Sequence, residues 1–261
     1  MAEHLLFKVG WSGFSLLFVV TGLYLANTGR KRWERSRRVA GTETTAIRDL
    51  QPGTAEVKGT ADLAGGATLL ESPLSKRDAL ATRVLVEEYH SSSEGGGNWK
   101  CIYEETDSVR TTVDDGTGEA TVDLPADGDL EVELTRTKVG PGEEPPAAIR
   151  QYVEGETDLD AATRREIGPL SVGDRRRYSH GEVEPGESVY VLGNAREEPG
   201  DWGERNFVID EPTPAGDFIL SDKSEQTLVE ENRSGGLLLL AFGAVFALSG
   251  AMFTTVPWFL F

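Results

Sequence analysis

Cysteine and histidine are nearly absent from this chain of 261 residues, which has one cysteine and three histidines. A RING-type zinc module needs about eight such ligands at fixed spacing. Even one zinc site made only of Cys and His would need all four residues, and His4 precedes the first long apolar stretch. Phosphate loops, nucleophile elbows, HExxH helices and Rossmann glycine patterns are also missing. We therefore expect no metal, no cofactor and no catalytic residues.

Lysine is scarce as well, with 7 Lys against 19 Arg, whereas acidic residues number 44. Residues 39–232 alone carry 42 acidic and 18 basic residues, a formal charge of −24. This composition resembles proteins of extreme halophiles, whose charge keeps them soluble at molar salt, where the Debye length is about 3 Å. So negative a field opposes phosphate backbones, and we expect no nucleic-acid partner.

Two stretches without any charge, Val9–Thr28 and Ser234–Phe261, predict transmembrane helices. A helix needs roughly 20 mostly apolar residues to cross about 30 Å of hydrocarbon. Trp11, Tyr24 and Trp258 lie near the ends of these stretches, where amphipathic rings favour the membrane interface. The second stretch is too long and too apolar for a buried core helix.

The first stretch could instead be a cleaved signal peptide, which would need positive charge before the apolar run. Glu3 and Lys8 precede it and nearly cancel, and the positive charge follows it instead, which is a stop-transfer pattern. This membrane-flanking cluster consists of Arg30, Lys31, Arg32, Arg35, Arg37 and Arg38. Basic residues beside a span stay in the cytoplasm. We therefore expect a two-span protein of the cell membrane with both termini outside and a cytoplasmic middle domain.

The middle of the chain has a sequence pattern typical of β proteins, in which short apolar runs are separated by turns of Gly, Pro and Asp every 8–12 residues. Predicted strands are Thr54–Ala61, Thr68–Glu71, Leu80–His90, Trp99–Glu105, Ser108–Val113, Glu119–Leu124, Leu130–Thr137, Asp174–Glu184, Glu187–Ala195, Asn206–Ile209 and Asp217–Ser221. A short helix is predicted at Ala147–Glu154. The stretch Val113–Leu124 resembles a hairpin of OB-type barrels.

The predicted fold class is therefore mainly β, with barrel-like or OB-like lobes and short helices, flanked by two transmembrane α-helices. The expected order is a tail at 1–8, a span at 9–28, a basic juxtamembrane linker at 29–52, an acidic β domain at 53–223, a helical lead-in at 224–233 and a span at 234–261.

Candidate chemistry is sparse in the β domain. Cys101 and His90 lie on strands that form a predicted hairpin, so they are either structural residues or a catalytic pair. A strand over the run RRRYSHGE places Arg175, Arg177 and Ser179 on one face. It places Arg176, Tyr178 and His180 on the other face. This run pairs with acidic residues or forms a binding surface. The candidate surface comprises Arg175, Arg176, Arg177, Tyr178, His180 and Trp99. Trp99 and Trp202 are expected at edges of the β core.

Several motifs, taken in order between the two spans, resemble the GIDE-type or "beside a membrane" domain of mitochondrial membrane-anchored E3 ubiquitin ligases. They are Gly59, the run Leu70-Glu71-Ser72-Pro73, the strand Val84–Tyr89, Trp99, the stretch Glu187–Gly193 and Ile219-Leu220-Ser221. In those ligases a RING follows the second span. Here the chain ends at Phe261, so we expect no RING.

Three functions remain open on this sequence. The first is a membrane-tethered, non-catalytic interaction or sensing domain, whose partners are the lipid bilayer and an unidentified protein or small ligand. The second is the E3 ubiquitin transferase activity that the resemblance implies. The third is an assembly factor of a membrane complex, because Gly236, Gly243 and Gly250 share one helix face and allow homo-oligomers through the second span.

The predicted topology is testable with a protease. The glycine- and serine-rich stretch Ser91–Gly97 is a flexible hairpin loop by composition. In sealed, oriented membrane vesicles, a protease supplied on the cytoplasmic face should cut there, which gel analysis of the fragments would show. Cleavage only from the outer face would contradict the orientation.

Overall fold

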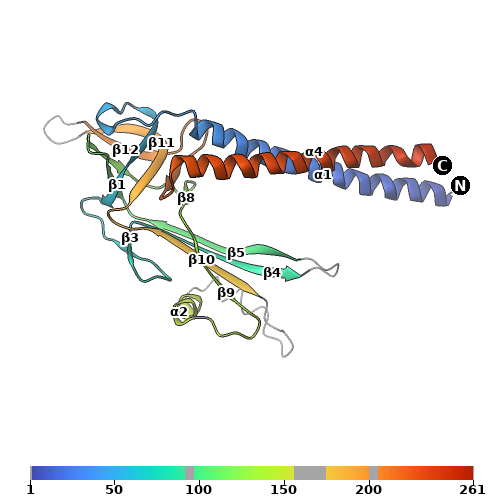
Figure 1. Ribbon diagram of the computed structural model, residues 1–261, viewed down its shortest axis with the longest axis horizontal. Helices are drawn as coiled ribbons and strands as arrows, with labels where there is room; N and C mark the ends of the chain where they lie inside the picture. The colour runs from blue at the N-terminus through green and yellow to red at the C-terminus, as the bar shows by residue number, and fades with distance from the viewer. Residues whose placement is uncertain (1, 92–96, 156–174, 200–204, 261) are drawn as a thin grey trace. The chain divides into compact units, whose positions relative to one another are not determined.

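The computed structural model describes residues 2–91, 97–155, 175–199 and 205–260 (Figure 1). These residues form two compact units. A helical unit contains the chain up to Glu43 and from Glu225 onward, and a β-rich unit contains Thr44–Ser224. Trp202 and most of the predicted loop at 91–97 lie outside the described residues.

The helical unit is an antiparallel pair of long helices, α1 (Ala2–Val39) and α4 (Glu225–Leu260), and both chain ends lie at the same end of the pair (Figure 1). A Cβ added to Gly22 would lie 2.4 Å from the backbone nitrogen of Ala247, and one added to Gly243 would lie 2.4 Å from that of Ala26. Glycine is therefore required at both positions for the helices to approach so closely.

This contact uses the glycine face for which homo-oligomers were predicted. Gly236, Gly243 and Gly250 all pack against α1 of the same chain. Each lies within 3.0 Å, measured from an added Cβ, of backbone atoms in α1. Homo-oligomers through α4 remain a prediction, and they would need another face of the helix or would have to displace α1.

The membrane-flanking cluster lies on a helix, whereas the sequence predicted a linker over residues 29–52. Helix α1 continues to Val39, because residues 30–39 contain good helix formers and no Gly or Pro. Arg37 and Arg38 occupy its last turn, where positive charge complements the helix dipole. The residues predicted as a tail at 1–8 also belong to α1 from Ala2 onward.

Among the described residues, one helix is long and apolar enough to cross a membrane, from Glu225 to Thr254. It contains most of the second predicted span, 234–261, and the lead-in that precedes it. The first predicted span, Val9–Thr28, lies within α1 and stays a prediction.

The β-rich unit is built on a closed five-stranded barrel, which confirms the barrel prediction. Its strands are β1 (Gly53–Leu63), β6 (Thr111–Asp114), β7 (Glu119–Val122), β11 (Ser188–Pro199) and β12 (Arg205–Glu211). They follow the order β1-β6-β7-β12-β11, and β11 pairs again with β1. Only the β7–β12 pair among these is parallel. Each strand contributes alternate side chains to the core, among them Ala55, Val57, Val113, Val122, Val191 and Ile209.

Two glycines of the resemblance motifs are needed for packing in the barrel. A Cβ on Gly59 would lie 2.4 Å from the carbonyl oxygen of Asp114 on the neighbouring strand. A Cβ on Gly193 would lie 2.6 Å from the Cγ2 atom of Ile209 and 2.9 Å from the ring of Phe218. Any side chain at these positions would push strands apart.

The β6–β7 hairpin has the tight turn that DDGTG predicts. One Asp115 oxygen accepts hydrogen bonds from the backbone nitrogens of Thr117 (2.8 Å) and Gly118 (3.1 Å), and the other accepts one from that of Ile47 (2.8 Å). Burial alone would raise the pKa of Asp115, but these bonds and the Thr117 hydroxyl favour the carboxylate more strongly, so the pKa is lowered. Gly116 supplies the positive φ of 79°.

A second, four-stranded sheet is assembled from two insertions into the barrel. Its order is β5-β4-β10-β9. Its strands are β4 (Ala81–Ser91), β5 (Gly97–Ser108), β9 (Thr135–Val139) and β10 (Arg176–Val183). The hairpin β4–β5 lies between β1 and β6 in the chain, and β9 and β10 lie between β7 and β11. Helix α2 (Ala147–Gly155) packs on one face of this sheet through Ile149 and Tyr152.

The predicted strand at Leu130–Thr137 is two strands in different sheets. Strand β8 (Asp129–Glu131) pairs with β13 (Ile219–Ser221) at the end of the barrel sheet, whereas β9 pairs with β10. The apolar residues alternate at 130, 132 and 134 and stop before β9, whose residues 135–138 are all polar, but this change of pattern does not say that the chain enters another sheet. The remaining short elements are η1 (Ile47–Asp49), β2 (Leu70–Glu71) and β3 (Asp78–Ala79).

The close helix contact predicts a large effect for a bulky residue at Gly22. Gly22→Leu should weaken the α1–α4 pair by at least about 1–3 kcal/mol, because the new side chain meets backbone and not a movable side chain. Thermal melting of the full chain in micelles, followed by circular dichroism, measures the effect. Gly13→Leu is the control, since a Cβ there meets nothing within 4 Å. Equal melting of the two variants would argue against the contact.

Candidate functional site

The predicted candidate surface lies on β10 and its neighbours in the four-stranded sheet. Directly opposed residues share a face, and β10 pairs Arg177 with Glu87 of β4 and with Lys138 of β9. The alternation predicted from the sequence is confirmed. Arg175 and Arg177 contact the aromatic rings of one face, whereas Tyr178 belongs to the core on the other.

The covered face of the sheet uses its predicted residues for stability. Tyr178 is buried with Val84 and Val86. Beside them, the Nη2 atom of Arg176 lies 3.1 Å from the Oε2 atom of Glu88, and both side chains are largely buried. Burial alone would lower the pKa of Arg176, but the hydrogen bond to Glu88 and the nearby Tyr178 raise it. Arg176 therefore keeps its positive charge at physiological pH.

His180 is half-buried on the same covered face, opposite Val84 of β4. Three predicted surface residues, Arg176, Tyr178 and His180, therefore lie on the side of the sheet that packs on α2, apart from Arg175, Arg177 and Trp99.

The other face carries a stack of cations and rings. The guanidinium of Arg177 makes two 2.5 Å hydrogen bonds to the carboxylate of Glu87 and lies 4.7 Å from the ring centre of Trp99. Trp99 meets Tyr89 edge to face at 5.3 Å. Arg175 lies 5.8 Å from the centre of the Tyr89 ring. Each ring thus has a cation over it, which holds both aromatic side chains in place.

Sequence reasoning missed two members of this face, Arg136 and Lys138. Strand β9 places both on the same side as Arg175 and Arg177, because Arg136 opposes Ser179 and Lys138 opposes Arg177. The alternation in TRTKV was the available signal, but it has meaning only once β9 is known to pair with β10. We define the basic face as Tyr89, Trp99, Arg136, Lys138, Arg175 and Arg177.

Cys101 and His90 do not form a catalytic pair. Cys101 opposes Glu87, whereas His90 opposes Asn98 and lies on the same face as Glu88, 3.4 Å from its carboxylate. A bulge between Val86 and Glu87 sets this register. Burial, aided by the nearby Glu104 and Glu87 carboxylates, raises the pKa of the Cys101 thiol, which disfavours the reactive thiolate.

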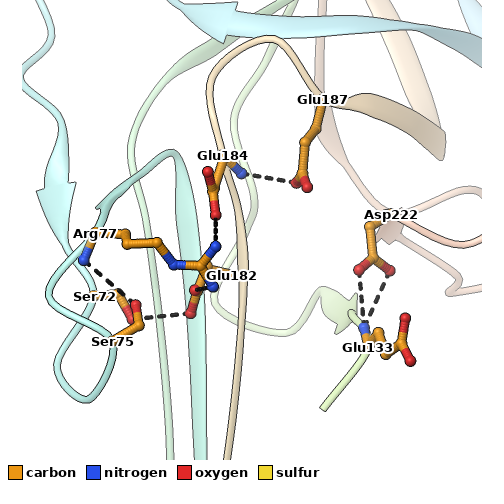
Figure 2. A network of polar contacts seen from close by, with 8 residues as sticks. All are labelled: Ser72, Ser75, Arg77, Glu133, Glu182, Glu184, Glu187 and Asp222. Atoms are coloured by element: carbon orange, nitrogen blue, oxygen red, sulfur yellow. Dashed lines mark hydrogen bonds and ion pairs between the residues drawn. The ribbon is translucent and has the colours of Figure 1, made fainter. Parts of the chain in front are cut away.

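A polar network lies where the β2–β3 hairpin meets β10 (Figure 2). Arg77 bonds both Glu182 and Glu184, and the Ser72 hydroxyl donates to the other oxygen of Glu182 at 3.0 Å. Glu182 is only 4% exposed in its side chain, so it depends on this cation. Ser72 belongs to the resemblance motif at 70–73, and its role here is to satisfy a buried carboxylate.

No group of three or more His, Cys, Asp or Glu residues suited to a metal occurs among the described residues. A shallow hollow of about 460 Å³ lies beside the β6–β7 turn. Its lining consists of Lys58, Gly59, Thr60, Asp114, Asp115, Gly116 and Ser188. It is wide open, and Asp115 is already committed to the turn. The basic face is therefore the better candidate site.

Comparisons with family models, curated proteins and solved structures find no match for this chain.

The network around Glu182 predicts a loss of stability on removing its cation. Arg77→Ala should lower the free energy of unfolding by about 1–3 kcal/mol, less than for a fully buried pair because Arg77 is 59% exposed. Chemical denaturation followed by tryptophan fluorescence measures the change. The control is Arg110→Ala, which breaks an exposed 3.0 Å pair with Glu198 and should cost about 0–1 kcal/mol. If both variants cost the same, Glu182 does not need Arg77.

Proposed function

We propose that this chain is a membrane-anchored, non-catalytic interaction module, whose β-rich unit is held beside the bilayer by α1 and α4. The observation that carries the proposal is the distribution of exposed apolar side chains. Among the described residues, every large hydrophobic side chain that is exposed lies on one of these two helices. Those on α1 run from Phe14 to Tyr24, and those on α4 run from Leu237 to Phe253.

The extent of these exposed side chains fits a bilayer. At about 1.5 Å per residue, the segment on α4 is about 24 Å long and that on α1 about 15 Å, both within a hydrocarbon core of about 30 Å. Leu248 and Met252 are 71% and 75% exposed, which is unfavourable in water and favourable in lipid. The antiparallel pair then returns the chain to its starting side of the membrane.

The orientation follows from the membrane-flanking cluster. Its residues, from Arg30 to Arg38, follow the apolar part of α1, so we place that end of the helix and the β-rich unit in the cytoplasm. Both chain ends then lie outside, consistent with their position at one end of the helix pair (Figure 1).

The same proposal includes an OB-type barrel in a GIDE-like domain. Counted in chain order, the barrel strands follow the closed order 1-2-3-5-4-1 with strands 3 and 5 parallel, which supports an OB-type topology. OB barrels often bind oligonucleotides. The charge of −24 over residues 39–232 favours a protein, lipid or small-molecule partner here. The described residues hold no catalytic constellation that favours the ligase alternative.

Anchoring is tested by placing charges within the apolar segment of α4. Val245→Arg together with Leu248→Arg should cost about 5–7 kcal/mol of insertion free energy, because each arginine costs about 2.5–3.5 kcal/mol at the centre of a span. The wild-type chain should stay in membranes after alkaline extraction, whereas the variant should be released or fail to insert. Gln226→Arg, an exposed change on α4 before the apolar segment, is the control. Release of the wild-type chain would refute anchoring.

A further inference from the structure

The basic face is exceptional in so acidic a protein. Four cations, on β9, on β10 and directly before β10, gather on one side of the four-stranded sheet, although residues 39–232 hold more than twice as many acids as bases. Helix α2 covers the opposite side of the sheet. The sheet therefore separates a face used for packing from a face that concentrates positive charge.

Most of this charge is not neutralised by any other residue that the structure describes. Arg136, Lys138 and Arg175 are exposed, and none makes an ion pair with another described residue. The nearby acids are already engaged, since Glu87 pairs with Arg177 and Glu104 accepts from Arg83. Elsewhere in the β-rich unit, cations such as Arg77 and Arg196 pair directly with carboxylates. Leaving three cations unpaired among so many acids suits an anionic partner.

The aromatic residues narrow the kind of partner. Tyr89 and Trp99 lie at one end of the basic face, half-buried and held by cations above their rings. Tyrosine and tryptophan beside basic residues are typical of protein surfaces at the membrane–water interface, where the rings lie at headgroup level. Anionic lipid headgroups also attract, by electrostatics, each basic residue that lies close to the bilayer surface. An acidic protein would also suit such residues, since Tyr, Trp and Arg are enriched in protein interfaces. The bilayer is the favoured partner because the proposed anchors keep it close to the basic face at all times.

We propose that the basic face binds the anionic surface of the lipid bilayer. The inference rests on the proposed function, because the two helical anchors keep the bilayer permanently within reach and so raise its effective concentration. The cations contact lipid phosphates while Trp99 and Tyr89 enter the headgroup layer. The opposite face, with α2, stays free for a partner in the cytoplasm.

The single cysteine of the chain allows a direct test. Cys101 is exposed and lies in the same cross-strand row as Glu87, Arg177 and Lys138, so a fluorophore on its thiol reports on the basic face. The labelled full chain is reconstituted in vesicles of phosphatidylcholine, or of phosphatidylcholine and phosphatidylglycerol in equal amounts. Both carry a lipid with a spin label on its headgroup, which quenches a nearby fluorophore. We expect strong quenching in the anionic vesicles and weak quenching in the neutral ones.

Charge reversal at the two unpaired cations of β9 identifies the surface. The double variant Arg136→Glu, Lys138→Glu should shift the equilibrium away from the state in which the four-stranded sheet is docked on the bilayer. At low salt the ratio of docked to undocked chains should fall at least about 25-fold, at roughly fivefold for each basic residue lost. The control is Lys100→Glu with Arg150→Glu, which makes the same charge change at exposed positions on the side of the sheet that packs on α2. Arg150 also loses an exposed ion pair with Glu144, which contributes little to stability. This control should quench like the wild-type chain. All samples are compared at the lowest salt concentration at which circular dichroism shows a folded chain, because salt screens the attraction.

Three results would overturn the inference. These are equal quenching in neutral and anionic vesicles, equal loss in the two double variants, and no quenching in either lipid. If any of them occurs while the chain resists alkaline extraction, the docking surface is wrong and the anchoring stands. If alkaline extraction releases the chain, the proposed function itself fails.

Discussion

The pairing of β1 with β11 is the interaction on which the β-rich unit depends. It joins eight residues of each strand, from Gly53 opposite Ala195 to Thr60 opposite Ser188, and it closes the barrel. The two strands are far apart in sequence, so their pairing carries a large loop-closure entropy. The chain between β1 and β11 must therefore leave the barrel and return to it without breaking this pairing. The second sheet arises from this constraint, because its strands are insertions in connections that begin and end at barrel strands.

Charge is distributed unevenly on this scaffold. The buried carboxylates of Glu182 and Glu88 each have an arginine partner, which compensates their charge. Basic residues gather at the end of α1 and on the basic face.

The sequence predicted the class of fold and many of the strands, because period-two alternation and turn residues are local signals. The β6–β7 hairpin with its Asp115 turn is the clearest case, since every residue needed for it lies within a few positions. It also predicted the two faces of β10. It did not predict that residues 130–137 divide between two sheets, or that Arg136 and Lys138 join Arg177. Those facts depend on strand pairing across long sequence separations, which alternation does not encode.

The sequence by itself determined the strong negative charge, the scarcity of cysteine and histidine and the two long apolar stretches, because composition and run length need no partner residues. Only the tertiary structure decided which cations are unpaired, that Cys101 and His90 lie on opposite faces, and that the glycine face of α4 contacts α1. The physical reason is the same in each case. A side chain's role depends on what opposes it across a sheet or a helix contact, and that neighbour is fixed by the closed barrel and the paired helices.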